Sequence, residues 1–351
     1  MNIKILKTAD RSAPGAEERS VHDEETQKVL PKPSSGELEK GVLKCRSCGT
    51  LVRLDSVSPL TLCKCVNPAC SSMLFIPMRI KDYWLYEPLG GGGMGSVYHA
   101  FNVRNPNAEF AVKILPRQRK NNNDLIETLL KEAQVGSEFG FHPHISKVYE
   151  YGCSDGEYFA SYEFVEGIRL DRIIESPVRR SDKEILLWSL QILSAEQHMF
   201  NKGYLFRDLK PQNVIIDTSG NVKMIDFGLV CKVEESKSIN AKIILGSPYY
   251  MPPERIIGEQ EGQYSEIYSL GMLLYHMMTG KTFYSSDDVK GIVEKHVFMP
   301  HISSLSVKFT GNSNQQMVSV LEKMILRDPQ RRIQSYKEAG AMLFNLYKAC
   351  A

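Results

Sequence analysis

The amino-acid sequence predicts an α+β protein with two lobes, the first rich in strands and the second rich in helices, preceded by a small cysteine-containing β module. Short alternating apolar stretches with glycine turns extend to about residue 165, and longer stretches with helical periodicity follow. Five of the eight cysteines lie between Cys45 and Cys70. With 351 residues and 42% hydrophobic content, the chain can bury the cores that this arrangement needs.

The charges of the chain are nearly balanced, with 43 basic and 41 acidic residues and a net charge of +2. This balance does not predict a nucleic acid or a membrane surface as a partner. No apolar run approaches the roughly 20 residues of a membrane-spanning helix. The stretch from Met1 to Asp10 lacks the apolar core of a secretory signal. We therefore expect a cytoplasmic protein without a membrane span.

Residues 1–41 are expected to form a disordered tail, because they are rich in turn-forming residues and lack apolar periodicity. Residues 42–78 form the cysteine module. Its short apolar runs, separated by cysteine-containing turns, predict small β-hairpins.

The cysteine spacing resembles that of a zinc ribbon. Cys45 and Cys48 form a C-x₂-C turn, and Cys65 and Cys70 form a C-x₄-C turn. Four thiolates would hold a structural zinc, and a segment of about 37 residues needs such a metal because it cannot bury a core of its own. Cys63 is the spare thiol in this prediction. The alternative is that the cysteines are simply buried. We expect the module to recruit a regulatory protein, and its modest basic content does not favour nucleic acid.

A glycine-rich segment begins the strand-rich lobe. Gly90, Gly92 and Gly95 have the spacing G-x-G-x-x-G. An apolar alternation starts at Val97, so a strand rather than a helix is expected after the glycines, with a turn at 105–107. Glycines at the tip of a strand–turn–strand unit let backbone N–H groups approach phosphate oxygens. A plain glycine-rich hairpin is the alternative.

A lysine follows in the next expected strand. Lys113 stands among apolar residues, where an ammonium group is costly to bury without an anionic partner. Glu132 lies in the helix expected over Asp124–Phe139 and is the candidate partner. The alternative is that Glu132 is a solvated helix residue.

The segment Phe206-Arg-Asp-Leu-Lys-Pro-Gln-Asn resembles the catalytic loop H-R-D-L-x-x-x-N of eukaryotic-type protein kinases, matching at every position but the first. Asp226-Phe-Gly resembles the second metal motif of that family. The resemblance implies that Asp208 accepts the proton of the substrate hydroxyl and that Lys210 steadies the γ-phosphate. It also implies that Asn213 and Asp226 hold Mg²⁺, with ATP as the phosphate donor.

Further motifs follow in the family's order over about Tyr83 to Tyr347. They imply a kinase domain over residues 79–351, with a small lobe at about 83–165 and a large lobe at about 166–350. Glu254, in Pro-Pro-Glu, is expected to pair with Arg332. The remaining residues implied to bind ATP lie in the small lobe and its connection to the large lobe: Val97 and Ala111 at the adenine, and the backbone of Glu163 and Val165.

The resemblance is to serine/threonine protein kinases, because Lys210 and Ser247 stand where such enzymes have their lysine and threonine. The glycine-rich segment with Met94, and Tyr249-Tyr-Met before Pro-Pro-Glu, look most like the bacterial members of the family. Protein substrates are therefore expected. One rival is a pseudokinase, an ATP-binding scaffold without activity. Another is a phosphotransferase acting on a small molecule, which the long activation segment disfavours.

Some positions depart from the family pattern. Phe206 replaces a histidine, and Glu266 replaces an aspartate that holds the catalytic-loop backbone. Gly136 replaces a bulky residue of the helix that carries Glu132, and weakens that helix. The activation segment contains Ser236 and Ser238. We expect autophosphorylation at one of these serines, since the arginine before the catalytic aspartate would then receive the phosphate. The alternative is that both are solvated loop serines.

Overall fold

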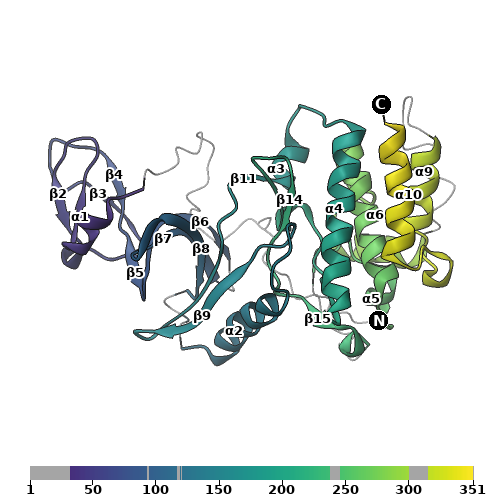
Figure 1. Cartoon of the computed structure of the whole chain (residues 1–351), viewed down its shortest axis with the longest axis horizontal. Helices are drawn as coiled ribbons and strands as arrows, with labels where there is room; N and C mark the ends of the chain where they lie inside the picture. Colours follow the sequence, from purple (N-terminus) through teal and green to yellow (C-terminus); the bar gives the residue numbers. More distant parts are fainter. Residues whose placement is uncertain are drawn as a thin grey trace. The chain divides into compact units, whose positions relative to one another are not determined.

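The computed structural model describes residues 32–92, 95–116, 119, 121–237, 246–299 and 315–350. The chain divides into two compact units (Figure 1). The sheet unit comprises the described residues of 32–133 and 148–164, and the helical unit comprises those of 134–147 and 165–350.

The sheet unit is built around a six-stranded antiparallel sheet in the order β5-β6-β7-β8-β10-β9. Its strands are β5 (Met78–Ile80), β6 (Tyr83–Gly92), β7 (Gly95–Asn102), β8 (Asn105–Ile114), β9 (Val148–Ser154) and β10 (Glu157–Glu163). Helix α2 (Asn123–Glu138) begins in this unit.

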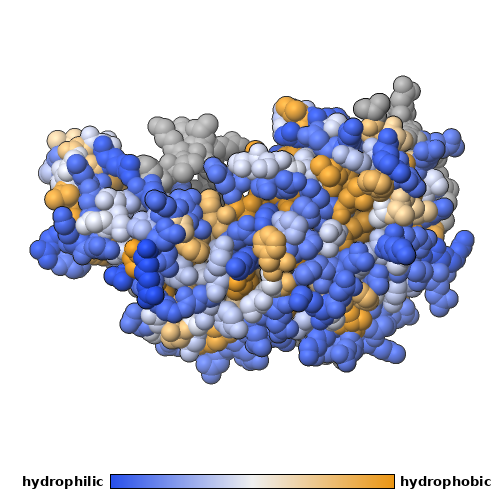
Figure 2. Space-filling model, in the orientation of Figure 1, coloured by the Kyte–Doolittle hydropathy of each residue, from blue (hydrophilic) through white to orange (hydrophobic). Residues whose placement is uncertain are grey.

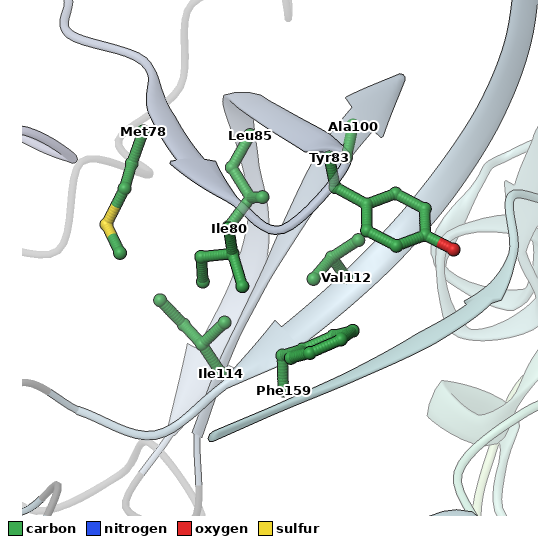
Figure 3. Packing of buried hydrophobic residues seen from close by; sticks show 8 residues of the cluster. All are labelled: Met78, Ile80, Tyr83, Leu85, Ala100, Val112, Ile114 and Phe159. Carbon is green, nitrogen blue, oxygen red and sulfur yellow. The ribbon is translucent and has the colours of Figure 1, made fainter. Parts of the chain in front are cut away.

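One face of this sheet carries a hydrophobic core, shown in Figure 3. Met78, Ile80, Tyr83, Leu85, Ala100, Val112, Ile114 and Phe159 form this cluster. Because successive strand residues point to opposite faces, burial of Val112 and Ile114 here places Ala111 and Lys113 on the other face. The core thus fixes the side on which the expected ATP-binding residues of β8 lie.

The cysteine module belongs to the sheet unit and contains the two hairpins that its sequence predicts. Strand β1 (Val42–Lys44) pairs with β2 (Leu51–Arg53), and β3 (Leu62–Lys64) pairs with β4 (Met73–Phe75). Helix α1 (Ser35–Glu39) precedes them, and the short 3₁₀-helix η1 (Leu54–Ser56) follows β2.

The module shares a hydrophobic core with the sheet. Leu38, Leu43 and Ile76 of the module cluster with Trp84, Tyr86 and Phe101 of β6 and β7. Phe101 and Ile76 are fully buried, so this is continuous packing rather than a surface contact. The tail expected over residues 1–41 therefore ends earlier than predicted, because burial of Leu38 stabilises α1. Residues 1–31 lie outside the described part of the chain.

In the described part of the helical unit, four helices pack side by side (Figure 1). They are α4 (Asp182–Asn201), α6 (Gln263–Thr279), α9 (Gln315–Met324) and α10 (Tyr336–Ala349). The other described helices are α3 (Leu170–Glu175), α5 (Pro253–Ile257) and α7 (Val289–Phe298), with 3₁₀-helices η3 (Pro211–Asn213), η4 (Val233–Glu235) and η6 (Pro329–Arg331). The strands are β11 (Gly167–Arg169), β12 (Tyr204–Leu205), β13 (Val214–Asp217), β14 (Val222–Met224) and β15 (Cys231–Lys232).

One expected turn is displaced. The turn predicted at 105–107 lies instead at Val103 and Arg104, because Asn102 pairs with Asn105 and β8 begins there. The side chain of Asn102 accepts a hydrogen bond from the backbone N–H of Arg104 at 2.9 Å, which stabilises the tighter turn.

The face of the molecule shown in Figure 2 is largely hydrophilic, with hydrophobic residues in separate patches. Among the helices that the structure describes, none combines the length and the apolar character needed to span a membrane.

Candidate active site

The catalytic-loop segment lies in the helical unit, between β12 and β13. Arg207 has a φ of 68°, and Asp226, which follows β14, also has a φ of 68°. Side chains other than glycine rarely adopt this left-handed conformation, and such backbone strain clusters at functional sites. The chain therefore holds both segments in unusual conformations, at the residue before Asp208 and at Asp226 itself.

Asp208 is buried, and its two carboxylate oxygens differ in their hydrogen bonds. Oδ2 accepts hydrogen bonds from Lys210 Nζ at 2.7 Å and from Asn213 Nδ2 at 2.8 Å. Oδ1 is buried and has no hydrogen-bond partner among the described residues. Burial raises the pKa of Asp208, against the opposing effect of Lys210. The carboxylate is thus fixed through one oxygen, while the other has no hydrogen-bond partner among the described residues.

Asn213 and Asp226 lie next to one another, although thirteen positions separate them in the sequence. The backbone N–H of Ile225 donates to the carbonyl oxygen of Asn213 at 3.0 Å, which joins the end of η3 to the end of β14. The carboxylate of Asp226 accepts only one hydrogen bond that the structure records, from the backbone N–H of Gly228 at 3.2 Å. Amide and carboxylate oxygens are the ligand type that Mg²⁺ prefers.

Lys113 and Glu132 form the expected ion pair within the sheet unit. Lys113 Nζ donates to the two carboxylate oxygens of Glu132 at 2.8 and 2.6 Å. Tyr162 donates to Glu132 Oε1 at 3.3 Å. Helix α2 continues through Gly136 to Glu138, so the glycine does not interrupt the helix that carries Glu132.

The glycine-rich segment forms a strand–turn–strand unit, as the sequence predicts. Gly90 pairs with Val97 and Gly92 pairs with Gly95, while residues 93 and 94 lie outside the described part. A Cβ on Gly95 would lie 2.9 Å from the carbonyl oxygen of Ile114, so packing requires this glycine. A Cβ on Gly90 would meet no atom of the chain within 4 Å. The chain itself leaves room at Gly90 for close backbone approach by a ligand.

Three of the remaining residues that the resemblance implies for ATP lie in strands of the sheet: Val97, Ala111 and Glu163. Val97 pairs with Lys113, and Ala111 lies two positions before Lys113 on the same face of β8. Glu163 ends β10, and Val165 begins the connection to β11.

Two predicted contacts are present, one at the end of the activation segment and one at the catalytic loop. Arg332 makes a bidentate ion pair with Glu254, with nitrogen–oxygen distances of 2.7 and 3.1 Å, and the side chains are fully buried. Glu266 accepts a hydrogen bond from the backbone N–H of Arg207 at 3.1 Å. The longer glutamate side chain therefore still reaches the catalytic-loop backbone.

The two candidate phosphorylation sites differ in what the structure describes. The Ser236 hydroxyl is buried and donates to the carbonyl oxygen of Val233 at 2.8 Å. Ser238 lies outside the described residues. A buried and bonded hydroxyl is a poor phosphate acceptor, so the described conformation disfavours Ser236.

The cysteine module brings Cys45, Cys48, Cys65 and Cys70 together, with all four sulfur atoms within 4.8 Å of one another. The Cys45–Cys70 and Cys48–Cys65 sulfur distances are 3.9 and 3.6 Å. A disulfide would need about 2.05 Å. Tetrahedral Zn–S bonds of about 2.3 Å would set sulfur atoms roughly 3.8 Å apart. Thus the four thiols fit zinc.

The structure distinguishes Cys63, the spare thiol of the prediction, from the proposed ligand Cys48. Cys63 packs against the core that the module shares with the sheet, away from this cluster. Hydrogen bonding to Thr50 lowers the pKa of Cys48 to about 6, which favours the thiolate form that binds metal.

Sequence reasoning missed two residues at the catalytic loop, Arg255 and Glu261. Glu261 lies between α5 and α6, and its side chain is 2.9 Å from Arg207 Nη2. Neither residue belongs to a motif used above, and their approach to Arg207 depends on how α5 and α6 pack.

Comparison with known proteins gives one family and several relatives. The model of the family described as "Protein kinase domain" matches residues 83–343. The chain is 30% identical over 277 residues to the serine/threonine-protein kinase PrkC of Bacillus subtilis, covering 79% of this chain and 42% of that protein. It is 28% identical over 262 residues to the probable serine/threonine-protein kinase PknB of Lactococcus lactis, covering 74% and 41%.

The match covers a larger share of a third relative. The chain is 30% identical over 231 residues to a probable cAMP-dependent protein kinase catalytic subunit of Encephalitozoon cuniculi, covering 65% of this chain and 70% of that protein. By contrast, the chain spans about two fifths of the length of the two bacterial relatives.

Proposed function

Because this chain belongs to the protein kinase family, we propose that it transfers the γ-phosphate of ATP to serine or threonine hydroxyls of protein substrates. The observation that supports this proposal most directly is the hydrogen bonding of the Asp208 carboxylate. One of its oxygens is held by Lys210 and Asn213, and the other is buried without a partner among the described residues. Such an oxygen is suited to accept the proton of an incoming hydroxyl group.

The proposed reaction forms a bond between the substrate oxygen and the γ-phosphorus as the bond to the ADP leaving group breaks. Asp208 orients the hydroxyl and takes its proton, and Lys210 offsets negative charge on the transferred group. Lys113, held by Glu132, would bind the ATP phosphates, while the segment from Gly90 through Gly92 to Gly95 would cover them. Val97, Ala111, Glu163 and Val165 would contact the adenine.

Mg²⁺ would be held by Asn213 and Asp226, and when bound it neutralises phosphate charge. The oxygen donors of these residues and the backbone bond that joins their segments support this assignment. Autophosphorylation is part of the proposal, with Ser238 as the candidate of the two serines, because Ser236 is buried.

Transfer of labelled phosphate from ATP with Mg²⁺ tests this function. We expect label on serine or threonine with the wild type and almost none with Asp208→Asn, since general-base help is worth about 10²–10⁴ in rate. Asp155→Asn is the matched control, because Asp155 is exposed in a turn with a φ of 52° that asparagine tolerates. If the wild type binds ATP but transfers no phosphate, the pseudokinase alternative gains and the kinase proposal fails.

We also propose that Cys45, Cys48, Cys65 and Cys70 hold a structural zinc ion, because their sulfur spacing matches a tetrahedral site. Elemental analysis should find one zinc per wild-type chain and much less in Cys48→Ser. Cys63→Ala is the control, since Cys63 packs into the neighbouring core. Zinc retained by Cys48→Ser at wild-type level would contradict this ligand set. Recruitment of a regulatory protein by the module stays a prediction.

A further inference from the structure

The arginine before the catalytic aspartate already has a carboxylate partner. Arg207 Nη2 lies 2.9 Å from Glu261 Oε1, and the two side chains are 8% and 1% exposed. The backbone N–H of Arg207 donates to Glu266 at 3.1 Å. Both the side chain and the backbone of this residue are therefore bound by carboxylates of the same unit, with little access for solvent to weaken the charge interactions.

A second arginine completes the arrangement. Arg255 Nε donates to Glu261 Oε2 at 2.7 Å, and its Nη2 lies 3.5 Å from Glu266 Oε1. Arg255 Nη1 also donates to the carbonyl oxygen of Arg207. We call Arg207, Arg255, Glu261 and Glu266 the charge network. Glu261 contacts both arginines and Glu266 contacts Arg255, while Arg207 Nε has no hydrogen-bond partner among the described residues.

The segment that carries Glu261 also binds the activation segment. The backbone N–H of Glu261 donates to the Ser236 hydroxyl at 3.3 Å, and the side chain of Gln260 donates to the carbonyl oxygen of Val233 at 2.8 Å. The connection between α5 and α6 therefore links η4 to the catalytic loop. In this way Glu261 makes the connection that a phosphate on the activation segment would otherwise make.

An added phosphate would find no favourable place in this network. A phosphoserine carries about −1.5 to −2 charges at neutral pH. To reach Arg207 it would have to displace Glu261, and it would then lie near Glu261 and Glu266 at once. Like charges at such distances oppose one another, and the displaced carboxylate of Glu261 would lose its contact with Arg207 in a buried site.

We propose that Glu261 is a positioning residue that holds Arg207, and through it Asp208, in the active arrangement without phosphorylation of the activation segment. The inference rests on the proposed kinase activity. It replaces the expectation that Arg207 receives a loop phosphate. Autophosphorylation, where it occurs, is then not required for activity.

The first test uses the full chain after phosphatase treatment, with mass spectrometry to verify that no phosphate remains. We expect phosphate transfer to a peptide substrate to begin at full rate, without a lag. A lag that disappears after preincubation with ATP would overturn the proposal while leaving the kinase activity established. Absence of transfer before and after preincubation would instead overturn the proposed function, so the two failures are distinguishable.

The second test changes Glu261 itself. Glu261→Gln keeps the shape but removes the charge, so kcat should fall by about a hundredfold, as for a small misplacement of a catalytic group. The KM for ATP should stay unchanged, and Glu261→Asp should restore much of the lost kcat. Glu259→Gln is the matched control, because Glu259 is exposed two positions away.

A double variant separates positioning from general loss of structure. If Glu261 acts through Arg207, adding Glu261→Gln to Arg207→Ala should lower kcat no further than Arg207→Ala alone. Additive losses of kcat would show that Glu261 acts independently of Arg207, and would overturn the proposal. If Glu261→Gln does not fold, the measurement of the lag with the wild type still tests the proposal.

Discussion

Glu196, on α4, is a buried carboxylic acid without a visible counter-charge. Both of its side-chain oxygens lack a hydrogen-bond partner among the described residues. Burial raises the pKa of Glu196 well above its usual range, and the nearby Glu266 raises it further. An unpaired buried carboxylate is costly, so burial favours the protonated form of this side chain.

Glu196→Gln should therefore become more stable relative to wild type as the pH rises. Because the folded pKa lies above the value of 4.5 used for the unfolded chain, the stability that Glu196 contributes is complete below pH 4.5 and declines as the pH rises toward the folded pKa. Glutamine removes this decline. Urea unfolding between about pH 5 and pH 8 measures this difference in the free energy of unfolding between the variant and the wild type. The difference should amount to about 1.4 kcal/mol for each unit of pKa shift. Glu259→Gln, at an exposed site, should show no such trend.

Lys113 gives a second prediction at this scale. Lys113→Met should lower kcat by about 10²–10³, the usual cost of losing one preorganised group that stabilises transition-state charge. Steady-state kinetics with the exposed-site variant Lys131→Met as control measures this effect. Wild-type kcat in Lys113→Met would mean that the ion pair with Glu132 has no part in phosphate transfer.

The sequence predicts many residues of the candidate active site, but it does not predict all of the side chains that contact them. The contact of Lys113 with Glu132, and separately that of Asp208 with Asn213, could be predicted because these residues stand in recognisable motifs. Glu261 and Arg255 reach Arg207 only because α5 and α6 pack against the catalytic loop. A contact that depends on tertiary packing leaves no local pattern in the sequence.

At the scale of elements, the sequence predicted strands and helices where periodicity was strong. The helix expected over Asp124–Phe139 is present as Asn123–Glu138, and the strand expected from Val97 after the glycines is present within β7. The expected turn at 105–107 and the boundary of the tail were wrong. Both depend on partners distant in sequence: the pairing of β7 with β8 for the turn, and the core around Leu38 for the tail.

The ion pair of Arg332 with Glu254 joins the start of α5 to the end of η6. Arg332→Met should lower the free energy of unfolding by about 3–5 kcal/mol, because it leaves the buried carboxylate of Glu254 without its partner. Arg331→Met is the control, since Arg331 is exposed at the neighbouring position. Equal midpoints of urea unfolding for the two variants would contradict a stabilising role of the ion pair.

At the scale of the whole molecule, the cysteine module and the sheet form one packed structure, since Ile76 and Leu43 share a core with Trp84 and Phe101. Loss of metal from the module should therefore weaken the sheet as well. After chelation we expect faster amide hydrogen exchange in β6 and β7, reversed by added zinc. Unchanged protection of these strands in zinc-free protein would show that the module opens independently.

The shared core also sets where this protein can be shortened. The family match begins at residue 83, but a chain trimmed to that point would lose Leu38, Leu43 and Ile76 and expose the aromatic rings of Trp84, Tyr86 and Phe101. Such a fragment would be prone to self-association through this newly uncovered surface. The module therefore cannot be removed or exchanged without changing the packing of the sheet. If the catalytic region of a relative replaced that of this chain, the positions of Trp84, Tyr86 and Phe101 in β6 and β7 would have to be redesigned to pack against the module.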